Sequence, residues 1–593
     1  MNSTWNKNLS LFKNRFPELA KAMEKQIVFF EKTIGSQNEK ELLYPFWEVF
    51  NAKNRDVTAK ENSIQIHSAY NPQREAENLI NSKKEEIQTA EAIVFEGFGL
   101  FYAPIFAAGL FPQKTIILVE PDVNHFLAPM ILVDAEPLFQ HKSIIFACGA
   151  SSEQAITLIN QYGILNSVFF SSAAQTAHAA KYFSELSTLI QRNKEKEKIN
   201  NATLEKFRTL WFRNSKRNIG KSALLEGVNI FRLRAKNLPF LVLGAGPSLE
   251  KILPHLATLK NKMVIVCVDT ALRALLQQNI QPDFIVLTDP QYWAYRHIAG
   301  LKSPESILIT ENSVYPTVFK FECKKIVCAK SQIPVGQFFE KFCGEQGYLG
   351  SGGSVASCAW TFAKFCGAKN IFMCGIDLSF PKNQTHIRGS AFEQKIHTDS
   401  TRIKPAETAS LPLLFSGNVS VEKDFYGNPV LSDQRMKMFA WWFESNIAAS
   451  PETKTFTLSP EGLYIPGVEP FRLEKLMELP DILPQKTEFL SAAQTAEEKF
   501  RREQGFKAAV KEFNAELQTA MNICIEAQKN LNRPDFNAEE YKTRLASLQI
   551  APVLALVPST NLSFLPEKAR NSQFFASIEK FCREYFLDTE SNV

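Results

Sequence analysis

The chain has 593 residues, enough for roughly three to four domains of about 150 residues each. Hydrophobic residues make up 45% of it and charged residues 22%, a balance that is ordinary for a globular protein. The 67 lysines and arginines exceed the 62 aspartates and glutamates by only 5, and no long basic run gathers that surplus, so we expect no nucleic-acid partner.

The cysteines, histidines and apolar runs exclude further classes of protein. The ten cysteines form no CxxC pair, and several lie inside apolar runs, which indicates reduced, buried thiols and a cytoplasmic protein. Because the eight histidines show no paired spacing with those cysteines, the sequence predicts no metal site. The opening MNSTWNKNLSLFKNRF has no signal-peptide core, and no apolar run approaches the roughly 20 residues of a membrane span, so we expect no membrane association.

The N-terminal part alternates strand and helix signals after a first helical stretch at 16–34. Strands are predicted at 64–70, 92–107 (strand, glycine turn and helix), 114–122 and 143–150. This rhythm predicts a small Rossmann-like unit within residues 1–205. Gly97, Gly99 and Glu120 follow the pattern of a dinucleotide or methyltransferase site, but the aromatic residues around that turn equally fit a degenerate, structural unit.

The segment 191–236 is charged and helical, which predicts a connector, and the strand rhythm returns after it. Continuous apolar character predicts a parallel sheet covered on both faces. The region 381–470 is rich in loop residues and contains one aromatic helix, and the chain beyond it is mainly helical. The six predicted strands are 240–249, 263–272, 283–290, 306–313, 325–330 and 370–378, and the aromatic helix is predicted at 436–447.

These elements predict an α/β protein of three domains. A central Rossmann-like parallel-sheet domain occupies residues 206–470. It is flanked by a smaller α/β domain at 1–205 and by a helical domain at 471–593.

The segment LGSGGSVASCAWTFAKFCGAKNIFMCGIDLSF at 349–380 reads as a glycine turn, a helix and a buried strand. Glycines at 350, 352 and 353 allow a close backbone approach, and Ser354 is placed to cap the helix. Free N–H groups and the helix dipole at such a turn form an anion site, so we assign Gly352, Gly353 and Ser354 to ligand binding. A tight turn without a ligand is the alternative.

A second motif, LVLGAGPSL at 241–249, runs from a hydrophobic strand into a glycine turn. Gly244 and Gly246 allow a nucleotide to approach the backbone, and Pro247 and Ser248 open the next helix. The motif is neither a full GxGxxG nor a Walker loop, which disfavours an NAD site and a P-loop ATPase.

Three aspartates and a histidine follow predicted strands. Asp269, Asp289 and Asp377 stand at carboxyl ends of strands, where open α/β sheets keep their ligands. Such a carboxylate can hold a ribose hydroxyl, a metal or an attacking hydroxyl group, and for Asp269 and Asp289 a helix cap is the alternative. We expect Asp269 to bind the nucleotide, and we assign Asp289 and Asp377 to catalysis, with Asp289 as a candidate base. His386, in the polar loop PKNQTHIRGS, is a second candidate general base or acid, although a lone loop histidine is more often only solvated.

Together these motifs resemble the motility accessory factor (Maf) flagellin glycosyltransferases. GAGPSL, VDTAL, PDFIVLTDP, GSGGSVA and GIDLSF followed by THIRG occur in the order of that family, and HSAYNPQREAENLI and FEGFGLFY resemble its N-terminal domain. The similarity covers roughly residues 60–450. The central part also resembles bacterial CMP-sialic acid sialyltransferases, although Ala245 stands where those enzymes carry a nucleotide-contacting asparagine.

The resemblance implies a CMP-activated donor such as pseudaminic or legionaminic acid, and a Ser or Thr hydroxyl of flagellin as acceptor. It implies that Gly352–Ser354 hold the CMP phosphate and that Ser248 and the Gly244–Gly246 turn hold the rest of the nucleotide. The proton of the acceptor passes to His386 or Asp289. No tightly bound cofactor is expected, and the absence of a DxD sequence gives no sign of a required divalent metal.

Two other functions remain open from the sequence. An archaeal pterin pyrophosphokinase shares the central domain and would need ATP and Mg²⁺. A non-catalytic flagellin-binding chaperone with a relict nucleotide fold is the third interpretation.

Overall fold

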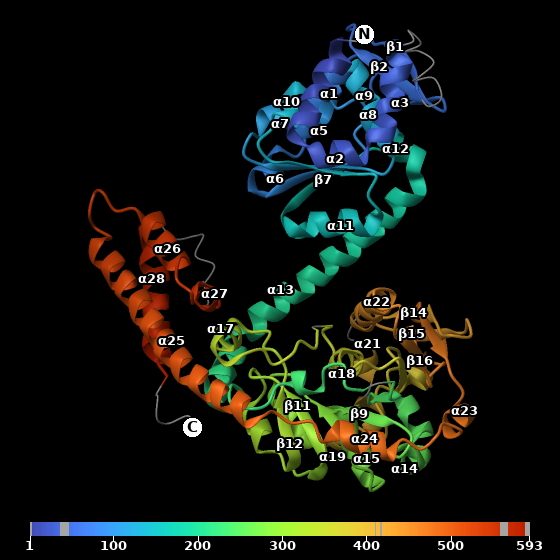
Figure 1. Cartoon of the computed structure of the whole chain (residues 1–593), viewed down its shortest axis with the longest axis vertical. Helices are drawn as coiled ribbons and strands as arrows, with labels where there is room; N and C mark the ends of the chain where they lie inside the picture. The colour runs from blue at the N-terminus through green and yellow to red at the C-terminus, as the bar shows by residue number, and fades with distance from the viewer. Residues whose placement is uncertain are drawn as a thin grey trace. The chain divides into compact units, whose positions relative to one another are not determined.

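The computed structural model describes residues 3–35, 47–235, 237–350, 352–409, 411–415, 418–557 and 567–587. The chain forms two compact units, Met1–Thr203 and Leu204–Val593. Each unit contains one all-parallel sheet, drawn in blue-cyan and in green to orange (Figure 1). The further division that the sequence predicts at residue 470 stays a prediction.

The N-terminal unit is built on a four-stranded parallel sheet in the order β6-β5-β4-β7. Its inner strands are apolar and buried along nearly their whole length, so helices must cover both faces. A three-stranded antiparallel sheet, β1-β2-β3, precedes it. The strands are β1 (Glu48–Asn51), β2 (Val57–Glu61), β3 (Ile64–Gln65), β4 (Ala92–Glu96), β5 (Thr115–Glu120), β6 (Ile144–Cys148) and β7 (Ser167–Ser171).

Twelve described helices or helical turns and two short 3₁₀ turns surround these strands or follow them. They are α1 (Ser3–Arg15), α2 (Pro17–Ala22), α3 (Glu24–Gly35), α5 (Pro72–Asn81), α6 (Lys84–Thr89), α7 (Tyr102–Leu110), α8 (Val123–Leu127), α9 (Pro129–Leu132), α10 (Glu136–Phe139), α11 (Ser152–Gln161), η1 (Ile164–Asn166), α12 (Ala173–Thr176), η2 (Ala177–Ala179) and α13 (Ala180–Ser222). The charged connector predicted from the sequence is the long helix α13, which runs from the first unit into the second.

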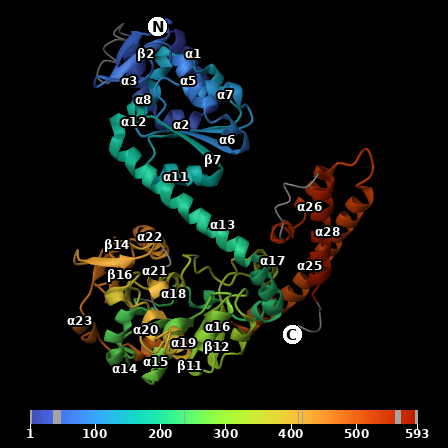
Figure 2. The same cartoon turned by 180° about the vertical axis from the view of Figure 1, so that it is seen from behind.

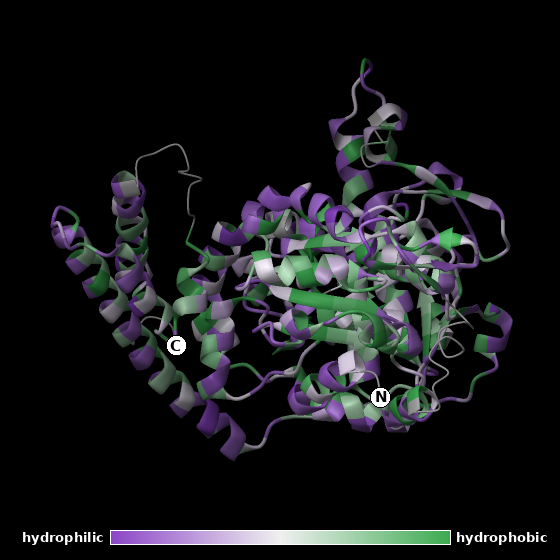
Figure 3. Cartoon of the chain, turned by 90° about the horizontal axis from the view of Figure 1, so that it is seen from above, coloured by the Kyte–Doolittle hydropathy of each residue, from purple (hydrophilic) through white to green (hydrophobic). Residues whose placement is uncertain are grey.

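The second unit is built on an eight-stranded parallel sheet in the order β12-β11-β10-β9-β8-β13-β16-β17. All six predicted strands are present, and β8, β9 and β13 are buried at almost every position. Figure 3 shows strands in the green of hydrophobic residues, and purple marks hydrophilic residues on the surrounding helices. The strands are β8 (Phe240–Leu243), β9 (Val264–Val268), β10 (Phe284–Val286), β11 (Ser303–Thr310), β12 (Cys323–Cys328), β13 (Asn370–Cys374), β16 (Lys454–Thr457) and β17 (Val468–Pro470).

The strand order fixes where a ligand site is expected. From β8 the chain builds outward to β12 and then returns to the other side of β8 with β13, so the order reverses between β8 and β13. In open α/β sheets the crevice at such a reversal, outside the carboxyl ends of the strands, is the usual ligand site.

The region that the sequence predicts as loop-rich contains more structure than expected. Its strands β16 and β17 extend the parallel sheet beyond β13, and β14 (Ser420–Lys423) pairs with β15 (Pro429–Ser432) as an antiparallel ribbon. The predicted aromatic helix is α22 (Gln434–Ala448). The short, partly polar sequence KTFT of β16 carries only a weak strand signal, and its pairing with β13 supplies the burial.

The remaining helical elements of the second unit cover the sheet or form the C-terminal part. They are η3 (Val228–Phe231), η4 (Pro247–Lys251), η5 (Leu253–His255), α14 (Leu256–Leu259), α15 (Asp269–Gln277), α16 (Tyr292–Ile298), η6 (Pro316–Lys320), α17 (Pro334–Cys343), α18 (Val355–Phe365), η7 (Pro381–Asn383), α19 (Ala391–Asp399), α20 (Ala406–Ala409), α21 (Leu411–Phe415), α23 (Leu473–Met477), α24 (Leu483–Leu490), α25 (Ala496–Asn530), α26 (Ala538–Ala546), α27 (Ala551–Leu554) and α28 (Glu567–Tyr585).

The C-terminal region is helical, as the sequence predicts. α25 and α28 lie side by side in both views of the chain (Figures 1 and 2). Their apolar faces share one hydrophobic cluster with α17 and the end of α13. Among the described residues, no helix has both the length and the apolarity that crossing a bilayer would require.

Candidate functional site

The glycine turn after β8 is locked to the turn after β13. Gly244 N–H donates to Cys374 C=O and Gly246 N–H donates to Gly375 C=O, both at 2.8 Å. A Cβ on Gly244 would lie 2.3 Å from the Gly375 oxygen, and one on Gly246 would lie 2.1 Å from Oδ2 of Asp377. Both glycines are therefore required for the close approach of two protein loops, whether or not a nucleotide approaches them as well.

The buried side chain of Asp377 stabilises this contact between the two turns. Its Oδ2 accepts a hydrogen bond from the Ser248 N–H at 3.1 Å, and its Oδ1 has no hydrogen-bond partner among the described residues. The side chain is almost fully buried, and burial raises the pKa of this carboxyl to about 6, against the opposing hydrogen bonds from Ser248. Asp377 thus lies beneath the site and orients the start of η4.

Pro247 and Ser248 begin η4, as the sequence predicts for the element after the glycine turn. The Ser248 hydroxyl lies 2.6 Å from that of Ser459 and accepts from the Gly375 N–H at 3.1 Å. It is therefore occupied by a buried network that ties β8, β13 and the end of β16 together. The role of Ser248 in nucleotide binding stays a prediction.

Asp269 is the first residue of α15 and is buried at the carboxyl end of β9. Its Oδ2 lies 2.6 Å from Nδ1 of His297, a nearly buried residue of α16. The pair joins the carboxyl end of β9 to α16, the helix that follows β10. No sequence motif selects His297, although a carboxylate placed at a buried strand end needs such a partner.

Asp289 follows β10 and is only half-buried. Its Oδ1 accepts from the Gln291 N–H at 2.8 Å, so it helps to start α16. Burial raises the pKa of this carboxyl, and the neighbouring negative charge of Asp269 raises it further. A carboxylate with a raised pKa at a sheet edge has the properties of a general base.

His386 lies in a loop that is fastened over the glycine turn. The next residue, Ile387, donates its N–H to the Ala245 C=O at 2.8 Å, and Arg388 pairs with Glu250 of η4. The His386 ring lies against Phe392 of α19 with 4.4 Å between centroids. Phe392 also contacts His297, at 5.0 Å. The structure therefore brings the predicted His386 close to the Asp269–His297 pair.

The protonation of His386 suits a base. Burial lowers the pKa of its ring to about 4, and the positive charges of His297 and Arg435 act in the same direction. The ring is therefore neutral at pH 7. Its Nδ1 has no hydrogen-bond partner in the described part of the chain.

The turn before α18 reaches the same edge of the sheet. The Thr288 hydroxyl, just beyond β10, lies 3.8 Å from Cys358 Sγ in the first turn of α18. Ser354 caps the helix by accepting from the Ala356 N–H at 3.3 Å, as predicted. Gly353 has a positive φ of 74°, which favours glycine at this position.

The aromatic helix α22 covers this turn. A Cβ on Gly352 would lie 2.8 Å from Trp442, and one on Gly353 would lie 3.0 Å from Phe439. Trp442 and Phe443 also meet Trp360 of α18 edge to face. Much of the aromatic character of α22 therefore serves packing on α18. Whether Gly352, Gly353 and Ser354 bind a phosphate stays a prediction.

The edge thus collects Asp289, His386 and the α18 N-terminus above a base of glycine backbone, Ser248 and Asp377. Exposed Arg435, at the start of α22, adds a positive charge that acts on His386. A neutral imidazole, a carboxylate, helix N–H groups and a cation can together bind an anionic ligand and remove a proton from a hydroxyl group.

Comparisons with known proteins identify the fold. Residues 212–383 match the family described as 6-hydroxymethylpterin diphosphokinase MptE-like, which covers the strands from β8 to β13. A solved structure of a Maf glycosyltransferase from Magnetospirillum magneticum AMB-1 is similar over 99% of this chain and 91% of its own, with a TM-score of 0.57 and 16% identity. The resemblance derived from the motifs is confirmed at the level of the fold.

Relatives in sequence come from Treponema pallidum (strain Nichols) and are each described only as an uncharacterized protein. One is 34% identical over 231 residues, which are 34% of this chain and 59% of that protein. A second is 26% identical over 257 residues, which are 43% of this chain and 85% of that protein. The match thus spans less than two thirds of the first relative.

Proposed function

We propose that this chain is a glycosyltransferase that moves a nonulosonic acid of the pseudaminic or legionaminic type from its CMP-activated form to Ser or Thr hydroxyls of flagellin. The observation that carries the proposal is the fold, which follows that of a Maf glycosyltransferase over 99% of the chain. The motif order from GAGPSL to THIRG supports the same family.

The geometry of the edge supports an anionic nucleotide-sugar donor. The α18 N-terminus would face the phosphate of CMP, because the helix dipole favours a negative charge there. Exposed Arg435 provides a cation for the phosphate or for the carboxylate of the sugar. The glycine turn after β8 would hold the other side of the nucleotide.

The reaction requires one bond to break and one to form. The bond between the anomeric carbon and the phosphate oxygen breaks, and CMP leaves with its electron pair. The acceptor hydroxyl oxygen bonds to the anomeric carbon, and its proton passes to His386 or Asp289. The neutral ring of His386 has a lone pair for this proton at pH 7, and Asp289 offers a half-buried carboxylate at the same edge of the sheet.

A thermal-shift experiment on the full chain tests the donor. CMP should raise the melting temperature, because a ligand that binds only the folded state stabilises it. ATP with Mg²⁺ should have a smaller effect. No shift with CMP at millimolar concentration would exclude the glycosyltransferase assignment, and no shift with either nucleotide would favour a binding protein without a nucleotide substrate.

A mass-spectrometric assay tests the transfer itself. Purified flagellin, the full chain and a CMP-nonulosonic acid should give flagellin heavier by one or more sugar residues, and free CMP should appear in equal amount. Replacing Gly246 by Val should abolish both products, whereas Gly300→Ala should keep them, because no atom lies within 4 Å of a Cβ on Gly300.

One observation favours a second candidate function. The match of residues 212–383 to the MptE-like family is consistent with a pyrophosphokinase that transfers diphosphate from ATP to a pterin alcohol. A thermal shift with ATP and Mg²⁺ but not with CMP, together with AMP release in the presence of a hydroxymethylpterin, would select this function.

A further inference from the structure

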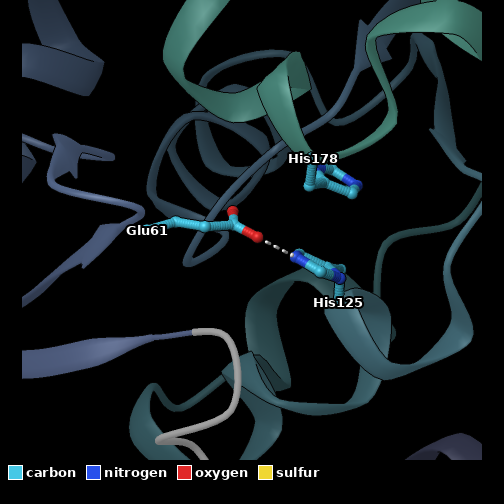
Figure 4. Close-up of side chains that lie close together, drawn as sticks. All are labelled: Glu61, His125 and His178. Atoms are coloured by element: carbon cyan, nitrogen blue, oxygen red, sulfur yellow. Dashed lines mark hydrogen bonds and ion pairs between the residues drawn. The ribbon is translucent and has the colours of Figure 1, made fainter.

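A cluster of ionisable side chains lies in the N-terminal unit, outside the site described above. It contains Glu61 at the end of β2, His125 in α8 and His178 in η2. Each of the three side chains is more than nine-tenths buried, with exposed fractions of 8%, 9% and 7%. Figure 4 shows Glu61 hydrogen-bonded to His125 and the ring of His178 beside that of His125.

One ligand-capable atom of each side chain lies within 4.8 Å of the other two. Nε2 of His125 is 2.9 Å from Oε1 of Glu61, and the two imidazole rings are stacked with 3.8 Å between centroids. We propose that Glu61, His125 and His178 form a binding site for a divalent transition-metal ion of the Zn²⁺ type.

The second nitrogen of each ring supports this assignment. Nδ1 of His125 lies 3.0 Å from Oδ2 of Asp122, and Nε2 of His178 lies 2.8 Å from Oε1 of Glu120. A histidine that binds a metal usually donates its other ring N–H to a carboxylate, which fixes the tautomer and the ring orientation. Both rings of the cluster have this arrangement, each with its own carboxylate.

The remaining nitrogens are then the metal ligands. Because Glu120 holds Nε2 of His178, Nδ1 of that ring carries the lone pair, and it has no hydrogen-bond partner among the described residues. A buried polar atom without a partner costs free energy, and an ion would supply the missing interaction. At His125 the ion would replace the proton that now joins Nε2 to Glu61.

The donor set selects the class of ion. Two imidazoles and one carboxylate are typical of zinc and its neighbours, whereas Mg²⁺ and Ca²⁺ prefer oxygen ligands alone. Bond lengths of about 2.1 Å place tetrahedral ligands roughly 3.4 Å apart. Nε2 of His125 already lies 2.9 Å from Oε1 of Glu61, so this pair must open slightly, and the stacked rings must rotate toward the ion.

The histidine spacing could not reveal this site. The three ligands lie more than fifty positions apart along the chain, and only the folding of β2, α8 and η2 brings them together. Because the ion would join three distant segments, it should stabilise the N-terminal unit. The site consists of residues of the first unit alone and shares none with the candidate site of the second unit, so this proposal does not depend on the proposed function.

Zinc and cobalt binding to the full chain tests the proposal. After removal of metal with a chelator, Zn²⁺ should bind with a stoichiometry of one in calorimetry and raise the melting temperature. Co²⁺ in the same site should give the visible absorption of a tetrahedral ion without intense thiolate charge-transfer bands. Absence of Zn²⁺ binding, or a cobalt spectrum dominated by thiolate bands from the ten cysteines, would overturn the site.

Three variants and one control locate the ion. Glu61→Gln and His178→Gln keep the volume of the side chain and should weaken Zn²⁺ binding by more than about 100-fold, while Asp122→Asn should weaken it by roughly 10- to 100-fold. His141→Gln is the control, because His141 is equally buried in the same unit but bonds the Lys114 carbonyl. Unchanged binding in the Glu61 and His178 variants would refute the assignment.

Discussion

In the N-terminal sheet, β4 ends at Glu96 and β5 at Glu120, whereas in the second sheet β8 is followed by Gly244 and β13 by Gly375. The two acids of the first edge are buried, and Glu120 is paired with His178. The glycines of the second edge draw two loops together. Asp289 and His386 remain half-buried above them.

The two parallel sheets therefore differ in the groups that stand at the carboxyl ends of their strands. A carboxylate that ends a buried strand is costly without a partner, and Glu120 of the first unit has His178 as its partner, just as Asp269 of the second unit has His297. In the second unit the turns after β8 and β13 are joined by backbone groups, and Asp289 and His386 stay half-buried. The following predictions test this contrast.

Replacement of His386 by Ala should have the largest effect. If His386 is the base, transfer to flagellin should fall by about 10²- to 10⁴-fold, while CMP affinity stays nearly unchanged. The initial rate of mass gain of flagellin measures transfer, and calorimetry measures CMP affinity. His397→Ala, an exposed histidine of α19, is the matched control and should leave both unchanged.

Full transfer activity in the His386 variant would assign the proton to Asp289, and Asp289→Asn would then show the loss. The pH profile separates the same two residues. Because the pKa of His386 is lowered to about 4, its ring is neutral from pH 5 upward, and kcat/KM should decline only as the pH approaches 4. A decline that starts well above pH 5 would not fit His386 and would favour Asp289, whose pKa burial raises.

Gly246→Val tests whether CMP binds at the glycine turns of the second unit rather than in the first unit. Its Cβ would meet Asp377 and the Gly375 carbonyl, so the loops cannot close, and the second unit should lose about 3 kcal/mol of its free energy of unfolding together with CMP binding. Gly300→Ala has only the cost of a left-handed backbone, about 1 kcal/mol, and should keep CMP binding. Urea unfolding and calorimetry measure the two effects.

Gly97→Ala makes the corresponding change in the N-terminal unit. Its Cβ would lie 2.8 Å from the Gln175 carbonyl at a φ of 67°, so the first unit should lose stability while CMP binding is kept. If Gly97→Ala abolished CMP binding, or if Gly246→Val left it intact, the assignment of the ligand to the second edge would be wrong.

The buried acids should give each sheet its own pH dependence. Burial raises the pKa of Asp377 to about 6 and that of Glu96 to about 7, the latter against the charge of Lys194. Each native carboxyl therefore holds its proton more tightly than the unfolded chain does. Its contribution to stability is present below the unfolded pKa and is lost as the pH rises through the folded pKa.

Asp377→Asn and Glu96→Gln should remove the loss of stability that each carboxyl causes as the pH rises. Between pH 4 and 7 the free energy of unfolding of each variant should rise relative to wild type by about 3 kcal/mol, because roughly two units of pKa shift are removed. Most of the rise should occur below pH 6 for Asp377 and continue to pH 7 for Glu96. Urea unfolding followed separately for each unit measures it, and a constant difference at all pH values would contradict the prediction.

Arg388→Ala should have the smallest effect. Its ion pair with Glu250 fastens the His386 loop to η4, but the arginine is 73% exposed and screened by solvent, so its loss should lower the melting temperature only slightly. The melting temperature measures this change. A loss as large as that of Gly246→Val would show that the loop, and not the glycine junction, holds the edge together.

Much of the fold follows from local sequence. The apolar runs predict all six strands from β8 to β13, because strands buried on both faces need continuous hydrophobic residues. β7, β16 and β17 were not predicted. The short sequences SVFFS, KTFT and VEP carry weak signals, and their burial or pairing is supplied by neighbours that are distant along the chain.

The candidate site also has a part that the sequence predicts and a part that it does not. Position at a strand end selected Asp269, Asp289 and Asp377, and the structure places all three at the carboxyl edge of the second sheet. The sequence could not show that Asp377 lies beneath the site, that Asp269 is held by His297, or that Phe392 joins His297 to His386. These relations depend on side chains from different elements.

By itself, the sequence determined the parallel sheets, the glycine turns and the strand-end acids, because hydrophobic periodicity and backbone freedom are local properties of a chain. Side-chain packing in the folded chain encloses Asp269 and Asp377 and leaves Asp289 half-buried. The tertiary structure also brought Glu61, His125 and His178 together. Burial and charge pairing arise between segments that are far apart in the chain, so no local pattern contains them.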